Sequence, residues 1–463
     1  MSGLFGIVSS KDCRQSLFYG TDYHSHLGTK KAGLAVLNHQ ITRCIHDIST
    51  SQFKSKFIEE LPKLKGKKGI GVISDFDSQP IIISCSFGKF AIATSGLLRN
   101  KNELAREIMS QGGSFSEMSS GMINATEVIS KLIAKKSSII SGIEYVFSRI
   151  IGSISLLVLA KEGIYAARDV SGKTTLVVGQ NEEILAVTSE TCAFPNLGFG
   201  PILELQPGEI VLLTKEGLKK EKKGYKNSKV CAFLWIYTGY PASSYEGINV
   251  EKVRENCGAN LAKDDKIKAD LVTGVPDSGT AHALGYSMSS GIPYRRPLVK
   301  YTDGYGRSYT PPSQEIRNKV AKLKLIPVKS VIEGKRIVVC DDSIVRGTQL
   351  RNQAIEKLWR NGAKEIHVRI ACPPLMFPCP YLLSTRTKKE LAARKVIKKI
   401  MGKKHFDIKA FIDDKSPLHQ KMIKAIQKEL GVTSLKYQTI DDMVKAIGLP
   451  KEKLCLYCWD GKE

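Results

Sequence analysis

Short apolar runs bounded by glycine or polar residues dominate the chain up to residue 214. Runs of this length and spacing predict strands, whereas Lys101–Met109 and Ala125–Lys136 have the spacing of helices. The predicted strands fall within residues 4–8, 31–37, 80–87, 89–98, 152–160, 174–179, 183–189 and 209–214. This part of the chain is therefore expected to form a domain that mixes sheets and helices.

The pattern changes after a charged, glycine-containing stretch, Lys215–Lys229, which we interpret as a linker. Buried-strand patterns now appear in ADLVTGVPDSG, RRPLVK, RIVVCDDS and EIHVRIAC. They alternate with helical patterns at Gly279–Ser289 and Thr348–Asn361, which predicts parallel strands covered by helices. From Lys388 the chain is rich in lysine and helical in pattern.

Length and composition are those of a globular protein. The 463 residues suggest two to four domains of ~150 residues each. Hydrophobic residues make up 42% and charged residues 25% of the chain, both ordinary values. No apolar run of about 20 residues and no secretory signal pattern are present, so we expect a cytoplasmic protein without a membrane partner.

The net charge of +25 would suit a polyanionic partner. The basic residues are spread along the chain, however, and their local runs are not interleaved with aromatic residues. Binding of single-stranded nucleic acid usually combines both features. We therefore interpret the lysines as a solvated surface and expect no nucleic-acid partner.

The segment RIVVCDDSIVRGTQL reads as a strand, two acids, a turn of small residues and a helix. Asp341 and Asp342 could hold ribose hydroxyls or Mg²⁺, which prefers oxygen ligands. The turn offers backbone N–H groups and hydroxyls to a phosphate at a helix N-terminus. It consists of Ser343, Ile344, Val345, Arg346, Gly347 and Thr348. The segment predicts a phosphate-binding loop.

Two further segments could contact the same polyanion. The loop of Asp277, Ser278 and Gly279 also follows a predicted strand and opens a helix, so it could take a pyrophosphate. The segment LVKYTDGYGRSYTPPSQEIRNKVAKLKLIPV is rich in Gly, Pro, Tyr and basic residues, which suits a closing lid. Taken alone, it would read as an ordinary surface loop. Its candidate phosphate contacts are Lys300, Arg307 and Arg317.

The three segments, in this order, resemble those of the glutamine phosphoribosylpyrophosphate (PRPP) amidotransferases, or amidophosphoribosyltransferases. The resemblance is closest from Val272 to Tyr381 and includes VPDSG, the lid and EGKRIVVCDDSIVRGT. It implies an α/β plus α+β protein. An N-terminal-nucleophile, glutaminase-like αββα sandwich (residues 1–225) would precede a type I phosphoribosyltransferase domain with a central parallel sheet (226–400). A helical tail (401–463) would follow.

The resemblance also implies roles for single residues. Asp341–Thr348 would bind the ribose 5-phosphate of PRPP, and Ser278, Asp341 and Asp342 would hold Mg²⁺. The other residues that it assigns to PRPP are Asp277, Ser278, Gly279, Lys300, Tyr305 and Arg307. Ammonia would displace pyrophosphate from C1 to give 5-phosphoribosylamine in purine biosynthesis. Relatives form dimers and tetramers, so a homo-oligomer is expected.

The chain has eleven cysteines, and in a reducing compartment they are expected to be thiols or metal ligands. The CxxC of Cys455 and Cys458 alone could indicate zinc, redox chemistry or chance. Cys231 and Cys379 match positions at which family members with a [4Fe–4S] cluster have ligands. The resemblance thus implies a four-cysteine cluster site, with zinc as the competitor. The other cysteines are expected to pack as small apolar residues.

The first half resembles the family's glutaminase domain in SGLFGIV, DSQP, ATEV and SETCAF, but its chemistry differs. Ser2 stands at the nucleophile position, where the family has cysteine. The run GIGVISDFDS lacks the family's arginine, Ser95 replaces the asparagine of the oxyanion hole, and Asn124 replaces an aspartate. Losing one oxyanion donor typically costs about 10²–10³ in rate. We expect a glutaminase half that retains no catalytic residue.

The sequence therefore predicts an amidophosphoribosyltransferase-like enzyme that uses ammonia, either free or from a separate glutaminase. One alternative is transfer of the phosphoribosyl group to a different amine. Another is a PRPP-sensing regulator that binds PRPP without consuming it. Turnover of PRPP distinguishes the enzymes from the regulator.

Overall fold

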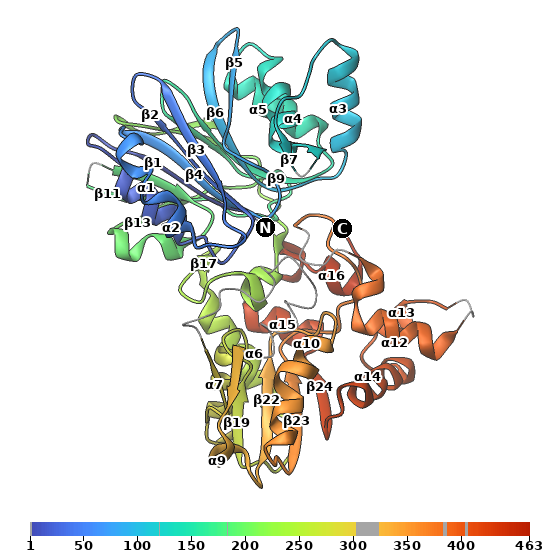
Figure 1. Ribbon diagram of the computed structural model, residues 1–463. Coiled ribbons are helices and arrows are strands. Elements are labelled where there is room, and N and C mark those ends of the chain that lie inside the picture. Colours follow the sequence, from blue (N-terminus) through green and yellow to red (C-terminus); the bar gives the residue numbers. More distant parts are fainter. Residues whose placement is uncertain (1, 120, 183, 302–323, 383–386, 403–405) are drawn as a thin grey trace. The chain divides into compact units, whose positions relative to one another are not determined.

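The computed structural model describes residues 2–119, 121–182, 184–301, 324–382, 387–402 and 406–463. The chain divides into two compact units (Figure 1). Unit 1 comprises Met1–Cys231, Ala242–Gly247 and Pro380–Leu383, and unit 2 comprises Ala232–Pro241, Ile248–Cys379 and Ser384–Glu463. Within the described ranges, no helix has the length and apolar character needed to cross a membrane.

Unit 1 contains two antiparallel sheets. The first has the order β13-β11-β12-β1-β4-β2-β3. Its strands are β1 (Gly3–Val8), β2 (Lys31–Leu37), β3 (Ile41–Asp47), β4 (Lys68–Ser74), β11 (Val177–Asn181), β12 (Ile184–Thr188) and β13 (Gly200–Glu204). The second has the order β15-β14-β10-β9-β6-β5. Its strands are β5 (Ile81–Cys85), β6 (Gly88–Leu98), β9 (Gly152–Leu159), β10 (Ile164–Ala167), β14 (Ile210–Thr214) and β15 (Gly217–Lys222).

Alternating side chains of these strands fill separate cores. In β1, Leu4 and Val8 face the core between the sheets, whereas Phe5 and Ile7 face helices. The helices on that side are α1 (Arg14–Asp22) and α2 (Phe53–Phe57). The second sheet is covered by α3 (Lys101–Ser110), α4 (Ala125–Ala134) and α5 (Ile139–Arg149) (Figure 1). Because a strand alternates its side chains, both faces of each sheet are apolar. The predicted αββα sandwich is confirmed.

The interpretation of Lys215–Lys229 as a linker is wrong for part of that stretch. Gly217–Lys222 forms β15, which pairs with β14 at the edge of the second sheet. Lysines are common on edge strands because they discourage pairing with another chain. Charge in this stretch therefore marks an edge strand rather than only a connection.

Unit 2 is built on a parallel sheet with the order β19-β22-β23-β24, and Figure 1 shows these strands side by side. Its strands are β19 (Leu271–Gly274), β22 (Arg336–Asp341), β23 (Glu365–Ile370) and β24 (Ser434–Tyr437). Helices α6 (Val250–Ala262) and α7 (Thr280–Ser290) cross closely at two glycines. A Cβ on Gly258 would lie 1.9 Å from the His282 carbonyl oxygen, and one on Gly285 would lie 1.9 Å from that of Glu255.

The lysine-rich tail is mostly helical, as predicted, but it also supplies β24 to the parallel sheet. Its helices are α12 (Ala392–Met401), α13 (Lys409–Ile412), α14 (Pro417–Leu430), α15 (Ile440–Ile447) and α16 (Tyr457–Asp460). The remaining short elements include β7 (Met118–Ser119), β8 (Met122–Ile123), β16 (Val230–Cys231), β17 (Ser244–Tyr245), β18 (Ile248–Asn249), β20 (Leu298–Lys300), β21 (Leu325–Pro327), α9 (Lys329–Ile332) and β25 (Leu454–Cys455).

Candidate functional site

Two loops meet at the carboxyl ends of β19 and β22. These strands are parallel neighbours, with Gly274 opposite Cys340, so the loops that follow them lie together. The Ser278 hydroxyl donates to Asp341 Oδ1 at 3.3 Å. The Asp342 backbone N–H donates to the same oxygen at 2.9 Å. The structure thus brings together the three residues predicted to hold Mg²⁺.

The two carboxyl groups are buried, with Asp341 7% and Asp342 5% exposed. Burial raises the pKa of both groups, and for Asp341 the neighbouring Asp342 carboxylate adds to the increase. A hydrogen bond from Ser343 and the positive charge of Arg254 act in the opposite direction on the pKa of Asp342. Two buried carboxylates beside a hydroxyl form a set of hard oxygen donors, which is the chemistry that Mg²⁺ prefers.

Close backbone contacts fix the loop after β19. A Cβ on Gly279 would lie 2.3 Å from the Cys340 carbonyl oxygen and 2.6 Å from the Val275 amide nitrogen. The Val275 N–H donates to that same carbonyl at 3.0 Å. Only glycine allows this approach without displacement of the backbone. The loop therefore lies directly against the end of β22, where the two aspartates begin.

The loop after β22 leads into a helix. Gly347 has a φ of +78° and precedes α10 (Thr348–Leu350), a π-helical turn (Arg351–Ile355) and α11 (Glu356–Arg360). This confirms the predicted helix. Ile344 is buried, and the Val345 carbonyl accepts from the Ala392 N–H at 2.7 Å. The loop is thereby tied to the start of α12.

The predicted cationic contacts are only partly described. Lys300 in β20 forms an ion pair with Asp277 of the loop after β19. Arg346 pairs with Glu390, with 2.6 Å between Nη2 and Oε1. Tyr305, Arg307 and Arg317 lie outside the described residues, so the predicted lid stays a prediction.

Sequence reasoning missed two buried residues behind these loops. The Arg254 guanidinium donates to the carbonyls of Trp235, Tyr237 and Gly239 at 2.7–3.0 Å. The His282 ring bridges the carbonyls of Arg254 (3.1 Å) and Ile236 (3.2 Å). Burial, with the charge of Arg254, lowers the pKa of His282 to about 3. The sequence signal that could have indicated the burial of His282 is its place within the apolar pattern of residues 279–289.

In unit 1, two described hydrogen bonds of Ser2 are made with hydroxyl groups. Ser2 is 6% exposed, and its hydroxyl donates to Ser74 Oγ at 3.3 Å. The Ser95 hydroxyl donates to the Ser2 carbonyl at 2.6 Å. Asn124, at the position of the family's aspartate, caps α4 by accepting from the Thr126 N–H. These contacts give Ser95 and Asn124 structural roles.

A buried polar cluster surrounds Glu190 in the same unit. Glu190 contacts His26 Nε2 (2.8 Å), the Tyr245 hydroxyl (2.6 Å) and the Ser243 hydroxyl (3.1 Å). Burial alone would raise the pKa of Glu190, but the interactions with His26, Tyr245 and His24 outweigh it and lower the pKa to about 2. Burial lowers the pKa of nearby His24 to about 4. Glu190 is therefore a buried carboxylate that stays charged near neutral pH.

Backbone hydrogen bonds lie close to the cysteines predicted to bind a metal. In unit 2 the N–H groups of Met376 and Phe377 donate to the Cys458 carbonyl, and the Ala232 N–H donates to the Cys455 carbonyl. Through these bonds, backbone that adjoins the predicted ligands in the sequence contacts the Cys455–Cys458 segment. Among the described residues, however, no three Cys, His, Asp or Glu side chains are arranged to hold a metal ion.

The seven other cysteines are largely enclosed. Cys13, Cys192, Cys257, Cys340 and Cys372 are buried, and Cys44 and Cys85 are partly buried. Burial raises the pKa of Cys13, Cys44 and Cys257 to about 12, so these thiols stay protonated near neutral pH. The five buried cysteines thus pack as small apolar residues, as expected.

Known proteins are similar to this chain in its N-terminal part and over its full length. Residues 69–196 match the family model described as glutamine amidotransferase domain. The chain is 34% identical to an amidophosphoribosyltransferase of Methanocaldococcus jannaschii, covering 100% of this chain and 97% of that protein. It is 32% identical to the Bacillus subtilis amidophosphoribosyltransferase, covering 99% and 93%. The chain belongs to the amidophosphoribosyltransferase family.

A solved structure of a family member agrees with this. The B. subtilis glutamine PRPP amidotransferase complexed with ADP and GMP superimposes with a TM-score of 0.85 at 32% identity, covering 99% of this chain and 96% of that one. The fold is therefore that of an N-terminal-nucleophile glutaminase domain joined to a phosphoribosyltransferase domain. Family membership makes the chain a phosphoribosyltransferase, in the glycosyltransferase class.

Proposed function

We propose that this protein forms 5-phosphoribosylamine from PRPP and ammonia, with release of pyrophosphate, and has no glutaminase activity of its own. The names of its relatives support the transferase reaction. The observation that carries the proposal is the contrast between two sites. Ser278, Asp341 and Asp342 are linked by hydrogen bonds at the start of the predicted phosphate loop, whereas the described hydrogen bonds of Ser2 are with hydroxyls.

In the proposed transfer, the loop after β22 binds the 5-phosphate through its N–H groups at the start of the helical run 348–360. The loop after β19 would take the pyrophosphate, and Lys300 would approach it; the ion pair of Lys300 with Asp277 of that loop supports this assignment. These groups orient C1 toward ammonia and stabilise the charge on the leaving group. Ser278, Asp341 and Asp342 would hold Mg²⁺, which supplies charge neutralisation at the pyrophosphate.

The proposed loss of glutaminase activity rests on the residues around Ser2. A serine hydroxyl needs a base to become a nucleophile. In an N-terminal-nucleophile fold the freed α-amino group serves as that base, so the proposed loss rests on the hydroxyl that replaces the family's thiol and on the changed substrate contacts. The two described hydrogen bonds of Ser2 are made with the hydroxyls of Ser74 and Ser95. Asn124 is committed to capping α4 and donates its amide to the Ser78 carbonyl. Ammonia would come from solution or from a separate glutaminase.

We also propose, from the motifs, that Cys231, Cys379, Cys455 and Cys458 bind a metal that takes part in no step of the transfer. The motifs support it, and the described side-chain positions do not. Iron, sulfide and zinc analysis of anaerobically purified protein tests it. Four irons and four sulfides per chain indicate a [4Fe–4S] cluster, one zinc indicates a structural zinc site, and neither indicates thiols alone.

The decisive experiment compares pyrophosphate release from PRPP with ammonium chloride and with glutamine as nitrogen source, under anaerobic conditions. We expect release with ammonia and no glutamate formation from glutamine. Glutamate release that requires Ser2 would overturn the loss of glutaminase activity. Binding of PRPP without consumption, whatever amine is supplied, would favour the regulator. Turnover only with another amine would favour the other transferase.

A further inference from the structure

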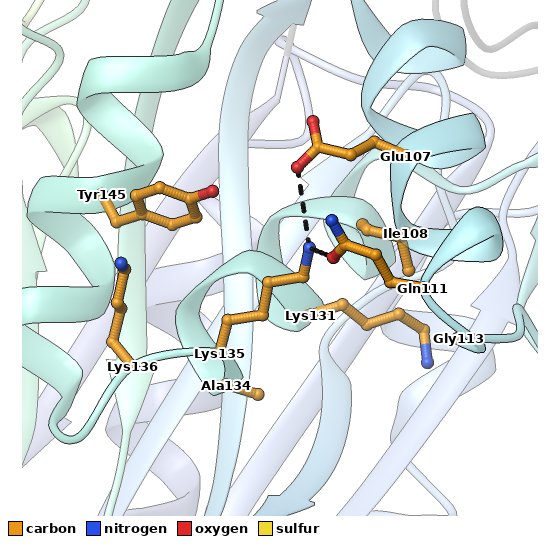
Figure 2. A pocket seen from close by; sticks show the side chains of 9 residues that line it. All are labelled: Glu107, Ile108, Gln111, Gly113, Lys131, Ala134, Lys135, Lys136 and Tyr145. Carbon is orange, nitrogen blue, oxygen red and sulfur yellow. Dashed lines mark hydrogen bonds and ion pairs between the residues drawn. The ribbon is translucent and has the colours of Figure 1, made fainter.

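A cavity of about 570 Å³ opens between α3, α4 and α5, on the outer helical layer of unit 1 (Figure 2). Volumes of this size are typical of small-molecule sites. Its lining residues are Glu107, Ile108, Gln111, Gly113, Lys131, Ala134, Lys135, Lys136 and Tyr145. None of them belongs to the PRPP site or to the surroundings of Ser2, so neither site explains the cavity.

Three lysines of the cavity come from a single stretch at the end of α4. Lys135 Nζ lies 2.6 Å from Gln111 Oε1 and 3.8 Å from Glu107 Oε1, and Figure 2 shows it in the middle of the cavity. Lys136 Nζ lies 4.0 Å from the centre of the Tyr145 ring. In the described part of the chain, Lys136 has no carboxylate within ion-pair distance.

Positive charge is in excess around the cavity. Lys131 is paired with Glu127 at 3.5 Å, and Arg149 is paired with Glu107 at 2.5 Å. Around the cavity there are thus four cations (Lys131, Lys135, Lys136 and Arg149) and two carboxylates (Glu107 and Glu127). A compact dianion would balance the charge that remains.

The walls add an apolar, flat surface. The Tyr145 ring stands on the α5 side opposite Lys135, and Ile108 and Ala134 contribute aliphatic groups (Figure 2). Aromatic and aliphatic walls with a few polar groups are characteristic of sites that bind an organic ligand rather than a bare ion. The excess of positive charge thus indicates an anionic group, and the apolar walls indicate an organic part of the same ligand.

We propose that this cavity binds a small phosphorylated organic molecule. Its phosphate would lie between Lys135 and Lys136, and its organic body would pack against Tyr145. The inference is independent of the proposed transferase reaction, because all residues involved belong to α3–α5 and the connections between them. The competing explanation is that the lysines only stabilise the C-terminal end of α4, where positive charge is favourable.

The test measures protection of lysines from acetylation in the full-length protein by mass spectrometry. The probes are phenyl phosphate and inorganic phosphate, each compared with sodium chloride at equal ionic strength. Lys421 and Lys424, exposed on α14, serve as internal references. We expect phenyl phosphate to protect Lys135 and Lys136 saturably, with a midpoint below about 1 mM, while the references react unchanged.

Two variants sharpen the test. K135Q/K136Q should weaken phenyl phosphate binding, measured calorimetrically in the same titration as the matched variant below, by at least about tenfold, because charge-assisted bonds are lost. The matched K421Q/K424Q variant should not. Tyr145→Leu should weaken phenyl phosphate but not inorganic phosphate. Protection that sodium chloride reproduces, or equal loss in both double variants, would overturn the proposal.

Discussion

Gly279 is the position at which the geometry of the transferase site can be tested by one added methyl group. A Cβ there would lie 2.3 Å from the Cys340 carbonyl oxygen and 2.6 Å from the Val275 amide nitrogen. Both neighbours are backbone atoms, so no side chain can rotate away. The substitution Gly279→Ala must therefore displace the loop after β19 from the end of β22.

The size of this displacement follows from the contact. Ordinary van der Waals contact begins near 3.4 Å, so the loop must move by about 1 Å. Inserting a methyl group into a close-packed position costs about 1–3 kcal/mol of stability. A shift of about 1 Å in groups that position a substrate can cost about 10²-fold in rate. We expect kcat/KM for PRPP to fall by about 100-fold.

The assay is the initial rate of pyrophosphate release with saturating ammonia and varied PRPP. Gly200→Ala is the matched control, because a Cβ at Gly200 has no heavy atom within 4 Å and its backbone is not left-handed. Circular dichroism verifies that both variants are folded. Wild-type kcat/KM in Gly279→Ala would refute the argument that this loop is packed against β22.

Three further predictions concern stability and the N-terminal site. Acidification from pH 7 to pH 5 should lower the free energy of unfolding of unit 1 by about 2 kcal/mol. The reason is that His24 has a pKa of about 4 in the folded protein, so near pH 6.5 it takes up a proton only in the unfolded chain. Glu190, whose folded pKa is about 2, should add a loss below pH 4.5, and urea unfolding followed at several pH values measures both. Asp265→Asn should cost about 3–5 kcal/mol, measured by thermal unfolding, because it leaves the buried Arg369 guanidinium without its counter-charge; an unchanged melting temperature would contradict this. Ser2→Ala should leave ammonia-dependent pyrophosphate release unchanged, and a loss of that activity with the fold intact would show that Ser2 has a role in transfer.

The parts of the fold that the sequence predicts well are those with local signals. The run 336–348 contains the apolar strand centre Ile337–Cys340, two acids, a short turn with a glycine and the start of a helix, so its structure depends little on distant residues. The meeting of Ser278 with Asp341 follows because two parallel neighbouring strands end at the same edge of the sheet. The family resemblance supplied the same pairing from motifs.

The elements that were missed depend on tertiary contacts. The residues of β15 are mostly charged, and only pairing with β14 makes them a strand. In the same way, β24 is a short segment of a lysine-rich tail that becomes a strand beside β23. Arg254 has the helical spacing of the buried Val250, Cys257 and Leu261, but its charge gives no sign of burial, which depends on three carbonyls of the 235–239 turn. Patterns of single segments contain no information about such partners.

The cluster around Glu190 has a consequence for dividing this protein into pieces. Two of its hydrogen-bond donors, Ser243 and Tyr245, come from the short segment Ala242–Gly247, which belongs to unit 1 although the chain has already contributed Ala232–Pro241 to unit 2. A fragment that stops at residue 225 would keep the buried carboxylate and lose both hydroxyls. The two units therefore alternate along the sequence, and a cut at residue 225 separates Glu190 from two of its partners. Exchange of this half between relatives would have to carry the 242–247 segment with it.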